Sequence, residues 1–190
     1  DEVSNADMLA AYVTSKDEPV EQLASEANKQ AGGIGATSDD ESCIKVMAEL
    51  YDHMRSFITY QYPSTTYQRG KDSFNIRLVQ ALQYPRDTIR KRSGTCIDLA
   101  ILYAAMLHSV NIRPRLVVLD GHCFPIGVSP SGAPIPVEVT FVGGGPNQSG
   151  TFKEAVEFGI KEWKELQQSG RYYVVDCQTC WMAGISPAEL

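Results

Sequence analysis

The sequence predicts one α+β domain, in which helices come first and strands follow. Long helical patterns fill much of the first 110 of the 190 residues, and runs rich in Val, Ile and Leu separated by turn residues come next. This order favours α+β over alternating βαβ units. A chain of this length buries roughly 70% of its unfolded surface, so it needs neither a disulfide nor a metal to fold.

Composition excludes several classes of protein. Lys and Arg number 17 and Asp and Glu 23, which gives a net charge of −6. Nucleic acids and anionic membranes attract basic surfaces, so neither is an expected partner. The longest apolar run, Leu99 to Leu107, is far shorter than the ~20 residues of a membrane helix. No signal peptide is visible, and the compartment stays open between the cytoplasm and export.

The first half of the chain contains two expected helices. Residues 1–38 are expected to be a tag, a flexible segment or a short helical segment, with a helix over Pro19 to Gln30. Ser38 and Glu41 form a capping-box pattern that predicts the start of a longer amphipathic helix. Apolar residues recur along it at three- and four-residue spacing, at Ile44, Met47, Leu50, Tyr51, Met54, Phe57 and Ile58.

A second capping-box pattern, Thr95 with Asp98, precedes the apolar segment Ile97 to Val110. With Thr95 as the N-cap, Cys96 is the first helical residue. The segment is apolar on nearly all sides, which predicts a buried central helix.

Strand patterns follow this helix. Arg115 to Leu119, Cys123 to Val128 and Ile135 to Phe141 are expected to form strands, with a turn over residues 129–134. Thr151 and Glu154 predict a helix that runs to about Gln168, and Tyr172 to Val175 is expected to be a last strand.

Cys96 is the strongest candidate for chemistry. In the first turn of a helix, a thiol lies against free backbone N–H groups and the positive end of the helix dipole. Both favour the thiolate, which is the nucleophilic form. Free cysteines are also often merely buried, so the position alone does not establish a nucleophile.

A nucleophilic cysteine usually needs an imidazole partner. His108 is expected about 18 Å from Cys96 along the same helix, too far to pair. His53 fits an ordinary position in the first long helix. His122 follows a glycine at the start of a predicted strand, where a sheet packed on the central helix would bring it to Cys96.

A third group should orient the imidazole. Glu138 is the best candidate, because it is a lone carboxylate among apolar neighbours in a predicted strand that folds back beside His122. Asp176 and Asp120 are alternatives, since the register of the hairpin is not fixed by the sequence.

Three blocks around these residues resemble the transglutaminase-like superfamily, a branch of the papain-like cysteine enzymes. They are Gly94-Thr95-Cys96-Ile97-Asp98-Leu99-Ala100, Gly121-His122-Cys123-Phe124 and Val137-Glu138-Val139-Thr140. The family usually has Asp where this chain has Glu138.

The resemblance, to bacterial members in particular, implies a papain-like core, with a central helix packed on an antiparallel sheet. It implies a domain over residues 39–190, with the motif core at 74–141 and a helix–strand extension at 150–190. It also implies catalytic roles for Cys96, His122 and Glu138, and Gln80 is the candidate for oxyanion stabilisation.

The implied function is acyl transfer on peptide or protein amides through a thioester, by a protease, an amidase or a transglutaminase. The alternative is a binding module that keeps the fold without the chemistry. No cofactor and no metal are expected; the partners are a peptide or protein substrate and further domains of a longer protein. Cys177 and Cys180 form a CxxC motif, but no helix is expected between Asp176 and Trp181, which disfavours a redox role.

Overall fold

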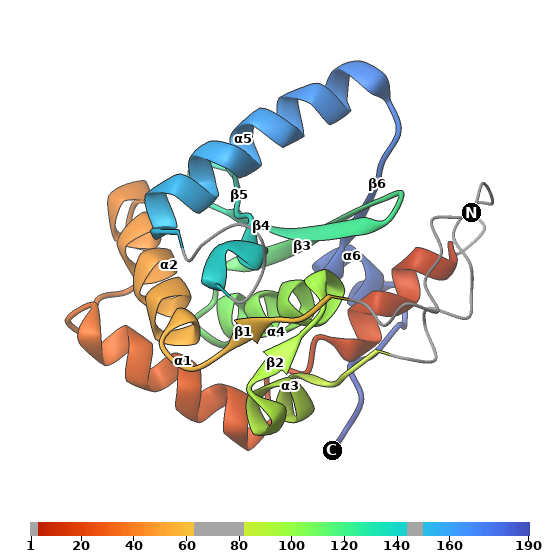
Figure 1. Ribbon diagram of the computed structural model, residues 1–190. Helices are drawn as coiled ribbons and strands as arrows, with labels where there is room; N and C mark the ends of the chain where they lie inside the picture. The colour runs from red at the N-terminus through yellow and green to blue at the C-terminus, as the bar shows by residue number, and fades with distance from the viewer. Residues whose placement is uncertain (1–3, 63–81, 144–149) are drawn as a thin grey trace.

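The structure is a computed structural model that describes residues 4–62, 82–143 and 150–190 (Figure 1). The first half contains η1 (Asn5–Tyr12), α1 (Glu18–Gln30), α2 (Asp40–Arg55), β1 (Thr59–Tyr60), α3 (Pro85–Lys91), β2 (Ser93–Gly94) and α4 (Cys96–Ser109). The second half contains β3 (Arg113–Leu119), β4 (His122–Val128), β5 (Pro134–Pro136), η3 (Val139–Val142), α5 (Phe152–Ser169), β6 (Tyr173–Asp176) and α6 (Cys177–Met182).

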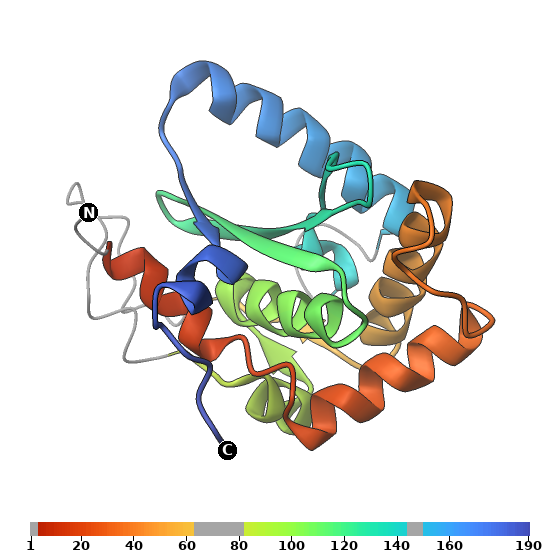
Figure 2. The same ribbon diagram turned by 180° about the vertical axis from the view of Figure 1, so that it is seen from behind.

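The main sheet is antiparallel and has the strand order β5-β4-β3-β6. Helix α4 packs against one face, and α5 crosses the other face (Figures 1 and 2). Alternate residues of the strands serve the two faces: Leu116 and Cys123 join the α4 core, whereas Val117, Phe124 and Ile126 form a second cluster with Leu166 of α5. The expected α+β class is therefore observed.

Helix α4 is the buried centre of the molecule, as the sequence predicts. All residues from Leu99 to Leu107 have no exposed surface. The Asp98 carboxylate accepts hydrogen bonds from the backbone N–H and the hydroxyl of Thr95, as in the predicted capping box. Helix α4 thus begins at Cys96, where the helix meets the start of β4.

The N-terminal segment is part of the same core. Leu9, Ala10 and Val20 are fully or almost fully buried, and η1 lies against α6 and β6 (Figure 2). Asp17, which precedes α1, forms an ion pair with Arg86 of α3. Residues 4–38 therefore help to cover α4.

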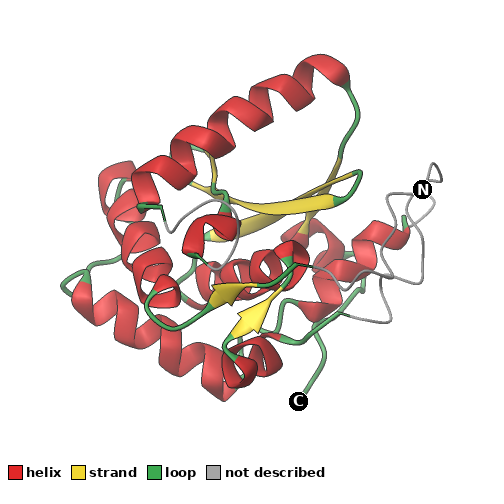
Figure 3. Ribbon diagram, viewed as in Figure 1, coloured by secondary structure: helices red, strands yellow, loops and turns green. Residues whose placement is uncertain are grey.

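The short strands β1 and β2 form a separate parallel pair next to α4 (Figure 3). Thr59 lies opposite Ser93 and Tyr60 opposite Gly94. This pair joins the end of α2 to the segment immediately before Cys96. Among the described residues, no helix has both the length and the apolarity that a membrane span requires.

Three sequence expectations need correction. The N-cap of α2 is Asp39 and not Ser38, because the Asp39 carboxylate accepts the backbone N–H of Ser42 at 2.7 Å. The strand expected over Ile135 to Phe141 stops at Pro136, and the chain continues as η3. The CxxC segment does form a helix, α6, which begins at Cys177.

Candidate active site

Cys96 occupies the N-terminus of α4 and is 8% exposed. The start of the helix is fixed by Asp98, which is buried and also accepts two hydrogen bonds from Gln83, from its backbone at 2.9 Å and its side chain at 3.0 Å. Gly94 packs so closely on Asp98 that an added Cβ would lie 2.8 Å from the Asp98 Cβ. The backbone leading to the thiol is therefore held on several sides.

Tyr60 borders the thiol from the β1–β2 pair. Burial raises the pKa of Tyr60 to about 12, with further contributions from Cys96, Tyr62 and Glu138. The Tyr60 and Tyr62 rings pack edge to face, with centroids 5.2 Å apart. Tyr60 is therefore near Cys96.

His122 begins β4, opposite Leu119 of β3, at the end of the sheet next to the start of α4. Its Nε2 lies 2.7 Å from Oε2 of Glu138 and donates its hydrogen to that carboxylate. The second oxygen of Glu138 accepts the backbone N–H of Thr140 at 3.0 Å and its hydroxyl at 2.6 Å. Glu138 is only 2% exposed, so these donors satisfy a buried carboxylate.

The charges of the pair reinforce one another. Burial lowers the pKa of His122, but hydrogen bonds to Cys96 and Glu138 and their charges outweigh it and raise the pKa to about 10. Burial raises the pKa of Glu138, and the hydrogen bond to His122, its positive charge and Thr140 together lower it below the ordinary value. At neutral pH the pair is therefore an imidazolium and a carboxylate. The structure brings Cys96, His122 and Glu138 together; their catalytic roles remain a prediction.

A second carboxylate lies beside this pair. Oε2 of Glu162, on α5, is 3.9 Å from Nε2 of His122. Nε2 and one oxygen of each glutamate lie within 4.8 Å of one another, a spacing that a metal could bridge. The 2.7 Å contact of His122 with Glu138 has the length of a hydrogen bond.

The alternative third residues lie elsewhere. Asp176 accepts hydrogen bonds from Arg113 and Arg115. In the sheet it lies opposite Arg115 of β3, four residues from Leu119, which lies opposite His122. Asp120 is an exposed residue of the β3–β4 turn. Gln80, the oxyanion candidate, lies outside the described residues.

The other two histidines have separate surroundings. His108, at the far end of α4, lies 2.6 Å from the Ser15 hydroxyl and packs on the Trp181 ring. His53 lies 3.4 Å from Glu26. Neither is near Cys96, as the sequence argument expected for His108.

The remaining cysteines are free and buried. Burial raises the pKa of Cys43 and of Cys180 to about 11, and it also raises the pKa of Cys123 and Cys177. Thiols of this kind are poor nucleophiles at neutral pH. The CxxC motif therefore opens a helix after a strand, contrary to expectation, but its thiols are held in the protonated form.

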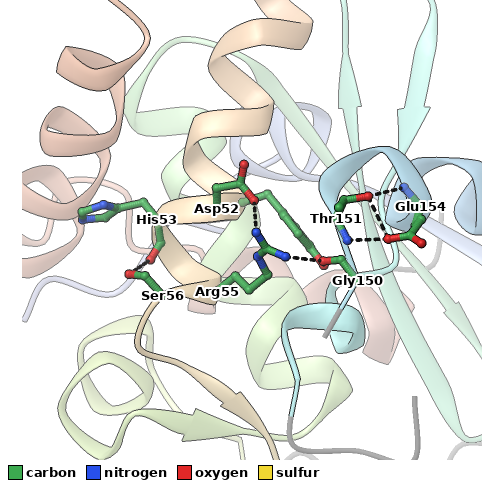
Figure 4. Close-up of polar contacts among 8 residues, drawn as sticks. Asp52, His53, Arg55, Ser56, Gly150, Thr151 and Glu154 are labelled. Carbon is green, nitrogen blue, oxygen red and sulfur yellow. Dashed lines mark hydrogen bonds and ion pairs between the residues drawn. The ribbon is translucent and has the colours of Figure 1, made fainter. Parts of the chain in front are cut away.

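Helix α5 is anchored where it begins (Figure 4). Arg55, at the end of α2, donates to the Gly150 carbonyl at 3.1 Å, and Tyr51 donates to the same oxygen at 3.1 Å. Thr151 and Glu154 form the predicted capping box. These contacts fix the helix that carries Glu162.

Sequence reasoning missed Glu162 and Gln83. Glu162 follows Gly159 and precedes Leu166 on the inner side of α5, and this placement on the apolar side is a signal that could have identified it. Gln83 is adjacent to the Gln80 segment but carries no pattern of its own. Its side-chain N–H groups contact Asp98 and the Ser93 carbonyl.

A comparison with known protein families agrees with the sequence motifs. The family model described as a transglutaminase-like domain matches residues 33–123, a span that includes Cys96 and His122 and ends before Glu138. A solved structure from Parabacteroides distasonis ATCC 8503, provisionally named a protease, is similar at 12% identity and a TM-score of 0.41, over 70% of this chain and 29% of that one. This chain thus spans less than a third of that protein. None of the curated proteins matches the chain. The resemblance to the transglutaminase-like superfamily is thereby confirmed: residues 33–123 match its domain family.

Proposed function

We propose that this chain is a cysteine-dependent acyl-transfer enzyme that acts on peptide or protein amides, with Cys96, His122 and Glu138 as its triad. One observation carries the proposal: Nε2 of His122 lies 2.7 Å from the buried carboxylate of Glu138, and the same imidazole is near enough to Cys96, at the N-terminus of the buried helix α4, for Cys96 to raise its pKa. A nucleophile, a base and an orienting carboxylate in contact form the arrangement that thiol acyl transfer requires. We also propose that α4 and the β3–β4 hairpin form a papain-like core.

In the first half-reaction, the Cys96 thiolate attacks the carbonyl carbon of the amide. The backbone N–H groups at the start of α4 stabilise the negative oxygen of the tetrahedral intermediate. The C–N bond then breaks, and the imidazolium of His122 gives its proton to the departing amine or ammonia. The products are a thioester on Cys96 and a neutral imidazole.

In the second half-reaction, the neutral imidazole takes a proton from the incoming nucleophile as it attacks the thioester carbon. The C–S bond then breaks and Cys96 leaves as a thiolate, which restores the thiolate and the imidazolium. Water yields an acid, the reaction of a protease or amidase. A primary amine yields a new amide, the reaction of a transglutaminase. Glu138 keeps Nε2 of His122 occupied, which leaves Nδ1 free to exchange protons with the thiol and the substrate.

The test is the rate of iodoacetamide alkylation at each cysteine between pH 4 and 9, measured by peptide mass spectrometry. We expect Cys96 to react faster than the other four cysteines below pH 7, because they are buried thiols with raised pKa values. His122→Ala should slow Cys96 by roughly 100-fold, the usual scale of acid–base assistance.

His108→Ala is the matched control, because it removes a histidine from the far end of α4 and should leave Cys96 unchanged. If Cys96 is no faster than an ordinary thiol and His122→Ala has no effect, the enzyme proposal fails and the binding-module alternative replaces it. A glutamine-containing peptide with a primary amine then separates hydrolysis from transfer by product mass.

A further inference from the structure

Glu162 presents a buried oxygen that has no hydrogen-bond partner among the described residues. This oxygen, Oε2, has almost no exposed surface, although the whole side chain is 21% exposed. It points to the same Nε2 of His122 that Glu138 binds, at 3.9 Å against 2.7 Å. A buried acceptor without a donor is unfavourable, so its position requires an explanation.

The surroundings of Glu162 define its charge. The pKa of Glu162 is raised above its ordinary value: burial is the largest cause, and the charges of Glu138 on the sheet side and Glu165 on α5 add to it, whereas the charge of His122 lowers it. His122 is therefore the cation that favours the ionised form of Glu162. A carboxylate and an imidazolium at this distance stabilise each other.

The backbone of α5 holds Glu162 in place. Gly159, one turn earlier, approaches the β5 end so closely that an added Cβ would lie 2.8 Å from the Pro136 carbonyl oxygen. In addition, the Ala155 carbonyl of α5 accepts the backbone N–H of Glu138 at 3.0 Å. The segments that carry the two glutamates are thus held together by direct backbone contacts.

We infer that Glu162 is a positioning residue: it faces Nε2 of His122 from α5, beside Glu138, and keeps the ring turned so that Nδ1 serves Cys96. Two carboxylates on one side of the imidazole oppose rotation of the ring away from the thiol. The inference rests on the proposed function, since it assigns Glu162 a role in the same triad.

The test is nitrogen NMR of the full chain with labelled histidine, which reports the tautomer and the pKa of each ring. The His122 signal is identified by its loss in His122→Gln, against only two other histidines. Glu162→Gln preserves the size of the side chain and removes the charge. We expect it to lower the pKa of His122 by about one pH unit, the lower end of the effect of a nearby opposite charge.

Two further variants complete the experiment. Glu165→Gln removes an exposed carboxylate from the same helix and should leave the pKa of His122 unchanged. Glu162→Asp retains the charge and should restore part of the His122 pKa that Glu162→Gln lowers. A purely structural role of Glu162 would not produce this recovery. The Cys96 alkylation rate at pH 6.5 should fall severalfold in Glu162→Gln.

The outcomes separate the two proposals. If Glu162→Gln leaves both the pKa and the tautomer of His122 as in the wild type, the inference about Glu162 is overturned, whatever the reactivity of Cys96. If Glu162→Gln shifts the pKa or the tautomer of His122 but His122→Ala leaves Cys96 alkylation unchanged, Glu162 orients the ring. In that case the proposed catalytic triad is overturned and the inference about Glu162 is not.

Discussion

At the scale of single residues, the two oxygens of Glu138 serve different partners. Oε2 accepts Nε2–H of His122, and Oε1 accepts both donors of Thr140. The family that the sequence resembles usually has the shorter Asp at this place. Here the chain leaves the sheet at Pro136, so the longer side chain has to reach His122 from the start of η3.

This geometry predicts that Glu138→Asp is not a conservative change. The carboxylate would be withdrawn by one C–C bond, about 1.5 Å, and could not keep both sets of partners. We expect Cys96 alkylation at pH 6.5 to fall about 10-fold in Glu138→Asp and further in Glu138→Ala.

Thr140→Val provides the comparison, since it removes the hydroxyl donor but keeps the backbone donor to Oε1. Its effect should be smaller than that of Glu138→Asp. Wild-type reactivity in Glu138→Asp would show that the length of residue 138 is unimportant and that another group orients His122.

The sequence indicated Cys96, His122 and Glu138 as candidates because each belongs to a local motif, such as the Thr95–Asp98 box. Glu162 belongs to no motif that chemistry would single out. Its contact with His122 arises only when α5 packs on the sheet, and the sequence does not determine that packing. Long-range contacts of this kind are therefore the part of the site that required the structure.

At the scale of elements, the segment over residues 135–141 shows why a strand pattern failed. Ile135, Val137 and Val139 alternate with other residues as in a half-buried strand. Pro134 and Pro136 lack the N–H groups that would extend the ladder with β4. The Glu138 side chain then accepts the Thr140 N–H as the N-cap of η3, and the Glu138 carbonyl accepts the Phe141 N–H at 3.3 Å, which closes a 3-10 turn. Local turn chemistry thus overrides the apolar alternation.

The contact of α5 with β5 predicts the effect of Gly159→Ala. Its Cβ would meet Pro136 and Val137 backbone atoms at 2.8 to 3.2 Å, and backbone cannot yield as a flexible side chain does. We expect a loss of about 1–3 kcal/mol in the free energy of unfolding, the usual cost of overpacking. Chemical denaturation measures it.

Displacement of α5 should also move Glu162 away from His122 and slow Cys96 alkylation. Gly170→Ala is the comparison: Gly170 ends the same helix at a φ of 68°, with nothing within 4 Å of an added Cβ. It should cost stability by backbone strain and leave the site unchanged. Equal effects of both variants on Cys96 would argue against this account.

At the scale of the whole molecule, one helix connects all layers. Helix α4 contacts the sheet, α1, α2 and α3, and its two ends carry the catalytic candidate Cys96 and the partly buried His108. The sequence predicted this centre correctly because the helix is apolar on all sides. It did not predict that η1 and α6 would cover the far end, since neither segment shows a strong apolar period.

The two partly buried histidines, His122 and His108, predict how the stability of the whole fold depends on pH. The pKa of His122 is raised to about 10, so its contribution is complete below the unfolded value near 6.5 and is lost as pH rises towards 10. Burial and Lys16 lower the pKa of His108, so its contribution is present above about pH 6.5 and is lost as pH falls through the lowered value. Each histidine changes the free energy of unfolding by up to about 1.4 kcal/mol per pH unit in its own window.

Urea unfolding of the wild type, His122→Gln and His108→Gln from pH 4.5 to 10 measures these two contributions. The difference between wild type and His122→Gln should shrink only on the alkaline side, and that for His108→Gln only on the acidic side. Parallel curves for all three proteins would contradict both charge assignments and, with them, the imidazolium on which the proposed chemistry depends.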